Sequence, residues 1–119
     1  YVKDVLKWSA KNLIKRCYYI IYGGLAHNIK RVIPDNLVAE INRVNYKTLK
    51  IFEWPKKNRI SDKEMLKTFN CGVGFCLIIS QNKYKNVRQH FTKEFKPYII
   101  GKISTGKSKV KLNGSINWI

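Results

Sequence analysis

The chain has 119 residues, the length of one ordinary domain, and its 45% hydrophobic content supports a core and excludes disorder over most of it. No apolar run approaches the roughly 18 residues of a membrane-spanning helix, and no signal or transit peptide is visible. The formal net charge of +17 indicates a polyanionic partner, nucleic acid or an anionic membrane surface, or else drift in an AT-rich genome, because the lysines are dispersed and accompany many Ile, Asn, Tyr and Phe.

Periodicity and turn residues predict helices and strands that alternate along the chain. In order, we expect a helix over residues 2–15, a strand over 17–22, a helix over 25–33 stopped by Pro34, and a strand over 37–41. There follow a helical turn over 49–54 ended by Pro55, a basic loop over 56–59, a helix from Ser61 to about Thr68, a buried central strand over 71–80, a helix over 84–95, and strands over 98–103 and 109–112 around a turn at Gly106. This alternation predicts an α/β (α+β) domain, a mixed β-sheet covered by helices.

The start of the helix at Ser61 is predicted from a capping box. Ser61 and Glu64 lie three residues apart, so the serine hydroxyl and the glutamate carboxylate can each accept a hydrogen bond from a free backbone N–H of the first turn.

Cysteine and histidine do not indicate a metal site. Cys17, Cys71 and Cys76 form no Cys-x-x-Cys pair, and neither His27 nor His90 lies at ligand spacing beside them. We therefore expect no metal ligands and no disulfide framework, but three buried or half-buried thiols, as in a reducing cytoplasm.

The first candidate site is a strand–Gly-Gly–helix junction over residues 20–33. Gly23 and Gly24 allow the backbone to approach a ligand closely, and a helix that begins just after them points free N–H groups at an anion. Asn28 is a candidate hydrogen-bonding partner of that ligand, and Arg31 is a candidate partner of a phosphate. A simple strand-to-helix turn explains the same residues without a ligand.

The second candidate site is the segment 68–75, where a helix is expected to end and a strand to begin. Gly72 and Gly74 lie on the same strand face, and glycine in a strand often marks close approach of a ligand or another backbone. Asn70 is placed either to cap the helix or to present its amide to a substrate.

Catalytic residues stay unassigned. No Ser/His/Asp or Cys/His order indicates a nucleophile, and Glu40 and Glu64 are interpreted as structural. A metal–ATP site needs several carboxylates in one pocket, so the essential groups of an enzyme would lie outside this chain.

The ordered motifs resemble the C-terminal domain of the phosphoribosylformylglycinamidine cyclo-ligase (aminoimidazole ribonucleotide synthetase) family. The family's Thr-Gly-Gly-Gly and Glu-Asn-Ile-Pro-Arg-Val-Leu-Pro are similar to residues 21–24 and 27–34, and its Glu-Met-Tyr-Arg-Thr-Phe-Asn-Cys-Gly-Val-Gly is similar to residues 64–74. Further matches, in the same order, are Ala39-Glu40-Ile41, Ile51-Phe52 with Trp54, and residues 98–103.

The resemblance implies that residues 1–119 are a single domain, the C-terminal domain of a longer two-domain enzyme. Such enzymes use ATP and Mg²⁺ to close the imidazole ring of formylglycinamidine ribonucleotide, giving aminoimidazole ribonucleotide in de novo purine biosynthesis. The N-terminal domain, absent here, would supply the dimer interface and most ATP–metal carboxylates, which leaves this fragment inactive alone.

The same resemblance implies a small ribonucleotide and ATP as ligands, a homodimeric full-length enzyme and a cytoplasmic location, with neither nucleic acid nor membrane as partner. The substrate- or phosphate-binding residues it implies are Gly23, Gly24, Asn28, Arg31, Asn70 and Gly72.

Four positions of the first motif depart from the family pattern. Ile21 stands for the family's Thr, Tyr22 for its first Gly, His27 for its Glu and Lys30 for its Pro. A tyrosine at a glycine position hinders close approach to a phosphate, and the loss of Thr removes a hydroxyl donor. The alternatives are an active ortholog from an AT-rich genome, a catalytically decayed paralog, and a basic nucleic-acid-binding module, for which no motif is present.

Overall fold

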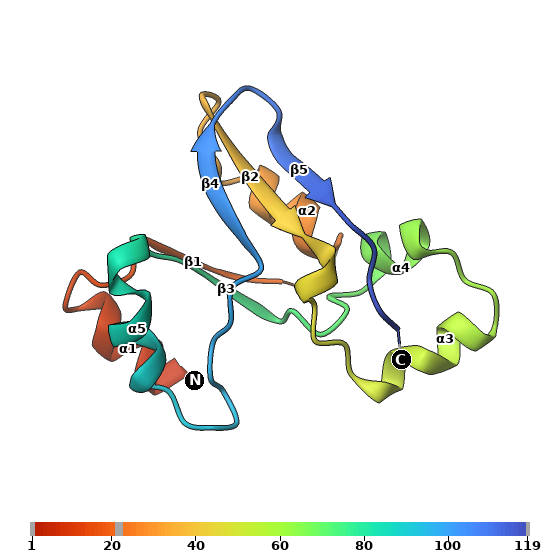
Figure 1. The fold of residues 1–119 in the computed structure, drawn as a ribbon, viewed down its shortest axis with the longest axis horizontal. Helices are drawn as coiled ribbons and strands as arrows, with labels where there is room; N and C mark the ends of the chain where they lie inside the picture. The colour runs from red at the N-terminus through yellow and green to blue at the C-terminus, as the bar shows by residue number, and fades with distance from the viewer. Residues whose placement is uncertain (1, 21–22, 119) are drawn as a thin grey trace. The chain divides into compact units, whose positions relative to one another are not determined.

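The computed structural model describes residues 2–20 and 23–118, in which helices, strands and 3-10 turns alternate (Figure 1). The chain forms two compact units, one drawn from Tyr1–Tyr18 and Cys76–Ile99 and the other from Tyr19–Phe75 and Ile100–Ile119. All the candidate site residues belong to the second unit. No helix in the described ranges is long and apolar enough to cross a bilayer.

The first unit contains α1 (Val2–Ser9), a 3-10 turn η3 (Gln81–Lys83) and α5 (Tyr84–Gln89). Both helices are shorter than predicted. The chain leaves the helical path before Asn12, whose φ of +55° is one that asparagine tolerates better than most residues. Phe95, inside the range predicted for the later helix, lies beyond its end and is exposed. Among the residues of this unit whose burial is described, the buried apolar side chains are Val5, Ile14, Cys76, Val87 and Phe91.

Strands β1 (Arg16–Tyr19) and β3 (Phe75–Ile78) form a two-stranded sheet. The N–H of Ile20 donates to the carbonyl of Gly74 at 2.9 Å and continues the pairing beyond β1. The buried central strand predicted over 71–80 is therefore wrong. Only its middle is a strand, in a sheet of two, because the chain makes a tight turn at residues 70–73 first.

The second unit is built on a three-stranded sheet of order β4-β2-β5, and Figure 1 shows β2 between its two partners. Strand β2 (Leu37–Asn42) pairs antiparallel with β4 (Gly101–Thr105) and parallel with β5 (Lys109–Asn113). Between β4 and β5 the chain crosses the start of β2, where the N–H of Gly106 donates to the carbonyl of Asn36 at 3.1 Å. The predicted mixed α+β fold is confirmed, with its strands divided between two sheets.

The sheet register places hydrophobic residues of β2 in the core. Val38, Ala39 and Ile41 are buried, which fits the central position of the strand. The register pairs are Leu37 with Thr105 and Ile41 with Gly101 on the antiparallel side, and Val38 with Lys109 and Asn42 with Asn113 on the parallel side.

The helices of the second unit include α2 (Gly24–Lys30), which contacts both α4 (Asp62–Thr68) and β5. Leu25 and Ile29 lie four residues apart on α2, so both fall on its buried face. The shorter elements are the 3-10 turns η1 (Arg43–Asn45) and η2 (Lys50–Phe52) and the helix α3 (Glu53–Lys57).

Pro55 lies inside α3, so the prediction that it ends a helical turn is wrong. It is the third residue of the helix, where its missing N–H is one of those that the first turn leaves unpaired. Lys56 and Lys57, predicted in a basic loop, form the last turn of α3, and Arg59 at a φ of +63° follows it.

The predicted cap of α4 is confirmed on the serine side. Ser61 is the N-cap, and its hydroxyl accepts a hydrogen bond from the N–H of Glu64 at 3.2 Å. The carboxylate of Glu64 accepts from the hydroxyl of Thr68 at 3.5 Å. The helix then buries Met65 completely and delivers the chain to the turn at residues 70–73.

Replacing Ser61 by alanine removes this cap. We expect the Ser61→Ala variant to lose about 1 kcal/mol in the free energy of unfolding, measured by urea titration. Ser108→Ala, at an exposed site between β4 and β5, is the matched control and should stay within about 0.5 kcal/mol of the parent. Equal losses in the two variants would contradict a capping role for Ser61.

Candidate functional site

The start of α2 presses directly on the end of α4 at Gly24. Gly24 is buried at a φ of +68°, and a Cβ built on it would lie 1.8 Å from the carbonyl oxygen of Leu66 and 3.3 Å from that of Phe69. Any side chain at this position would therefore overlap backbone atoms. The close approach that the sequence predicted at Gly24 is one made by the protein's own backbone.

Gly23 is the N-cap of α2, with a φ of +85°. A Cβ built on it would lie 2.8 Å from Cδ2 of His27, so the exposed imidazole covers this face of the glycine. His27 therefore stands over the first turn of α2, where the resemblance implies a glutamate. Ile21 and Tyr22, the other departures at this junction, lie outside the described residues.

Asn28 and Arg31 lie in different environments on α2. The side-chain amide of Asn28 donates to the carbonyl of Gly24 at 2.7 Å and braces the first turn of α2. Arg31 is exposed at the C-cap of the same helix. Seven helical residues span about 10 Å, so the structure separates Arg31 from Gly23 and Gly24 by the length of α2.

Asn70 organises a tight turn through both its side chain and its main chain. Its carboxamide oxygen accepts from the N–H of Gly72 at 3.0 Å, and its carbonyl accepts from the N–H of Val73 at 2.9 Å. Cys71 and Gly72 have φ values of +51° and +94°, as in a type I′ turn. A Cβ on Gly72 would lie 2.5 Å from the carbonyl oxygen of Lys47, so this glycine also admits a neighbouring backbone.

Cys71 is held at the centre of this turn with no exposed surface. Its thiol donates to the carbonyls of Met65 at 3.5 Å and Phe69 at 3.7 Å. Burial raises the pKa of the Cys71 thiol to about 11 and that of Cys76 to about 12, so both are protonated at neutral pH and neither is an activated nucleophile. Cys17 is exposed, against the prediction of a buried or half-buried thiol.

The structure brings the two predicted motifs together. The start of α2 is in contact with the backbone at Phe69, and Asn70 follows immediately. We call residues 23–24 and 70–72 the glycine-turn pair. It contains Gly23, Gly24, Asn70 and Gly72 of the predicted site, is braced by Asn28, and leaves Arg31 at the far end of α2.

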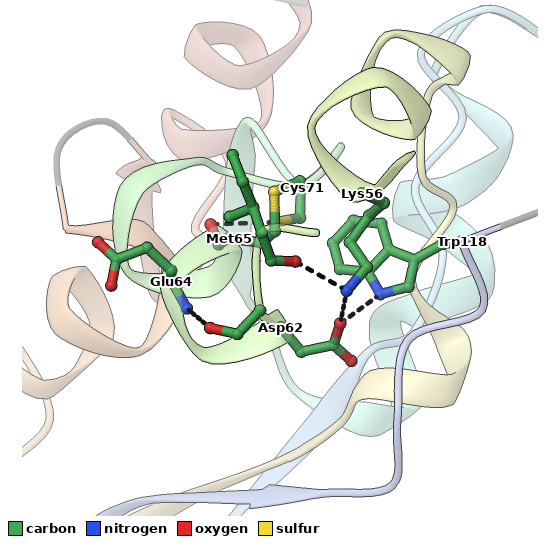
Figure 2. A network of polar contacts seen from close by, with 8 residues as sticks. Lys56, Asp62, Glu64, Met65, Cys71 and Trp118 are labelled. Carbon is green, nitrogen blue, oxygen red and sulfur yellow. Dashed lines mark hydrogen bonds and ion pairs between the residues drawn. The ribbon is translucent and has the colours of Figure 1, made fainter. Parts of the chain in front are cut away.

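A polar network beside α4 has no signature in the local sequence (Figure 2). Lys56 Nζ lies 2.5 Å from Asp62 Oδ1 and donates to the carbonyl of Ile60 at 3.0 Å. The indole N–H of Trp118 donates to the same carboxylate oxygen at 2.9 Å, and Lys56 Nζ lies 5.5 Å from the centre of the indole ring. The hydrogen bond from Lys56 lowers the pKa of Asp62, while partial burial opposes the shift.

The described carboxylates do not form a metal–ATP centre. Within residues 2–20 and 23–118 no three His, Cys, Asp or Glu side chains gather as a ligand set. Glu40 accepts from the hydroxyl of Ser104 at 3.2 Å and pairs with Lys102 at 3.7 Å, and Asp62 is engaged as above. The residues present therefore do not fit a Mg²⁺ ion by themselves.

Residues 1–113 match the family model described as AIR synthase related protein, C-terminal domain. The chain belongs to this AIR synthase related family. Its match to the C-terminal domain includes both segments of the glycine-turn pair and stops short of Trp118.

Curated relatives of this AIR synthase related chain are named phosphoribosylformylglycinamidine cyclo-ligase. The relative from Ligilactobacillus salivarius is 36% identical over 109 residues, covering 90% of this chain and 32% of its own length. The relative from Carboxydothermus hydrogenoformans is 35% identical over 115 residues, covering 95% and 33%. That from Caldicellulosiruptor saccharolyticus is 37% identical over 114 residues, covering 94% and 33%. The chain thus spans about a third of the length of these relatives.

The contact at Gly24 of this AIR synthase related domain predicts a large cost for any side chain there. Gly24→Ala should lower the free energy of unfolding by at least about 2 kcal/mol, because the methyl group meets the Leu66 carbonyl and the φ is left-handed. Gly74→Ala is the matched control, since a Cβ there meets only the Asn70 side chain, at 3.8 Å. Urea titration of both variants measures the difference, and similar stabilities would refute the close contact.

The Asp62 network predicts a stability difference that depends on pH. Because the pKa of Asp62 is lowered in the folded chain, its contribution is complete above the ordinary value of 3.8 and is lost as the pH falls through the folded value. Asp62→Asn should therefore cost about 1 kcal/mol at pH 7, a surface-pair value appropriate to a side chain that is 43% exposed. Urea titrations at pH 7 and near pH 2 should show this loss vanish, and a loss independent of pH would exclude the ion pair as its origin.

Proposed function

We propose that this chain is the C-terminal part of an ATP-dependent cyclo-ligase that converts formylglycinamidine ribonucleotide to aminoimidazole ribonucleotide in cytoplasmic purine biosynthesis. The observation that carries the proposal is the glycine-turn pair. It joins the two segments that resemble the cyclo-ligase family most, residues 21–34 and 64–74, through one backbone contact at Gly24. The names of the relatives support the same reaction.

The glycine-turn pair offers backbone groups rather than reactive side chains. The first-turn N–H groups of α2 follow a glycine that has no side chain to cap them, and such donors favour an anion such as the phosphate of a ribonucleotide. Asn70 and Gly72 supply a second, rigid turn beside them. Ring closure within one substrate depends mainly on holding the reacting atoms in place, and this is the part that we assign to the pair.

ATP and Mg²⁺ are assigned to the rest of the longer enzyme. When bound they supply phosphoryl transfer to the formyl oxygen, and the described residues of this chain offer no carboxylate set for them. The homodimer interface is assigned to the same missing portion. The chain alone is therefore expected to be inactive.

A chimera tests the proposal. Joining this chain to the part of the Ligilactobacillus salivarius relative that precedes the matched segment should give ATP-dependent formation of aminoimidazole ribonucleotide, while the chain alone gives none. Arg31 lies at the opposite end of α2 from the glycine-turn pair, so Arg31→Ala tests whether the ribonucleotide extends along this helix. A fall in kcat/KM of about tenfold or more is expected if the guanidinium contacts the ribonucleotide there. Lys107→Ala removes the same charge from the exposed turn between β4 and β5 and should leave the rate unchanged.

A folded chimera that binds ATP and forms no product would refute this function and favour the decayed paralog. The position of His27 supports that alternative, because its imidazole packs over Gly23 where the family has a glutamate carboxylate. Restoring the family residue with His27→Glu should then raise the activity of a weak chimera.

Nucleic-acid binding is the second candidate because of the +17 charge. It predicts binding of RNA or DNA by this chain that weakens steeply with salt. Absence of binding at about 50 mM salt, where electrostatic association is strong, would exclude it.

A further inference from the structure

The residues that follow β5 take a defined path across the second unit. Gly114 turns the chain at a φ of +67°, and a Cβ built on it would lie 2.7 Å from Cγ2 of Val44 and 3.0 Å from Oδ1 of Asn42. Asn42 caps η1 by accepting from the N–H of Val44 at 3.2 Å. The chain therefore passes close to the start of η1, and a side chain at position 114 would have to displace those of Val44 and Asn42. Ile116 is then buried against the unit.

The last described residues are fastened at two separate points. The carbonyl of Asn117 accepts from the hydroxyl of Thr48 at 3.2 Å. Trp118 donates its indole N–H to Asp62 at 2.9 Å and lies beside the ammonium of Lys56, as Figure 2 shows. Residues 114–118, which we call the strap, thus contact η1, residue 48, α3 and α4. The family match ends at residue 113, just before the strap.

Both fastening points of the strap support the glycine-turn pair. A Cβ built on Gly72 would lie 3.2 Å from Thr48 Cα and 2.5 Å from the Lys47 carbonyl oxygen. The backbone of residues 47–48 therefore packs directly against the turn at residues 70–72. Asp62 is the first residue of α4, whose carbonyl at Leu66 receives Gly24. Gly72 therefore contacts residues 47–48, and Gly24 contacts α4. The strap is hydrogen-bonded to both of these elements.

We propose that the strap is a positioning element for the candidate site, which holds the two glycine turns at the spacing that the ribonucleotide requires. The strap contacts do not depend on the proposed function, but the role in binding the ribonucleotide rests on it. A displacement of about 1 Å at a site that works by positioning costs on the order of 100-fold in rate, so a small movement of residues 47–48 or of α4 suffices to matter. Trp118 and Thr48 are then positioning residues without any contact to substrate.

Cys71 provides a probe of the strap that needs no activity. It is fully buried inside the second glycine turn, and its thiol has a pKa of about 11, so alkylation requires the turn to open. Iodoacetamide labelling of the 119-residue chain, with the modified cysteine located by mass spectrometry, therefore measures the opening of this turn. The exposed Cys17 reports the reactivity of the reagent in the same sample.

Removal of the strap's anchor should open the turn. Trp118→Ala is expected to raise the labelling rate of Cys71 about tenfold, since it removes a hydrogen bond to a charged group together with the indole ring. Thr48→Val should raise it less, and Trp118→Phe, which keeps a ring beside Lys56, should recover part of the protection. Trp54→Ala is the matched control, because it removes an indole that is 71% exposed on α3, and it should change the rate less than about twofold.

The dependence of labelling on urea separates local opening from general instability. Opening of the strap should give a rate that hardly changes at low urea, because little surface is exposed. An unchanged Cys71 rate in Trp118→Ala, or an increase that follows global unfolding steeply with urea, would overturn the proposal.

In the active chimera, Trp118→Ala should lower kcat/KM for the ribonucleotide about tenfold while ATP binding stays the same. A Trp118→Ala chimera with unchanged kcat/KM would overturn the positioning role. A parent chimera without activity would refute the proposed function and leave the labelling result standing, so the two failures are distinguishable.

Discussion

The second unit depends on one steric constraint, the missing side chain at Gly24. Its α-carbon stands against the carbonyls that end α4, which lets the N-terminal end of α2 reach that helix without an intervening layer of side chains. Segments more than 40 residues apart in sequence are thereby joined by main-chain atoms, whose positions vary less than those of long side chains. This contact sets the relative positions of the two segments of the candidate site. The side-chain amides of Asn28 and Asn70 stabilise the backbone around it.

The structure gives several candidate residues a role in folding. The side-chain amides of Asn28 and Asn70 form hydrogen bonds within their own turns. Gly24 and Gly72 lack a side chain where a neighbouring backbone segment packs against them. A residue pattern typical of ligand binding is here also a pattern required for folding. Ligand binding at these turns stays a prediction, whereas the contacts show directly that the same residues build the turns.

Sequence predicted what local interactions determine. The cap at Ser61, the strand β2 and the helix α2 follow from signals within a few residues, and each is present near its predicted bounds. The strand predicted through Cys71 failed because apolar composition cannot distinguish a buried strand from a buried turn, and the turn is held by thiol and amide contacts. The partnership of Asp62 with Trp118 spans 56 residues and has no local signature at all.

The order of the three-stranded sheet has a consequence for how the chain is made. Strand β2 is synthesised before both of its partners, β4 and β5, which come from residues 101–113. Until those residues leave the ribosome, the most apolar strand of the second unit has two open edges, and open edges invite pairing with other chains. Completion of the three-stranded sheet also requires contacts between residues far apart in sequence, and such contacts form slowly. A nascent chain is therefore exposed to aggregation and to chaperone capture from the synthesis of β2 until β4 and β5 close the sheet.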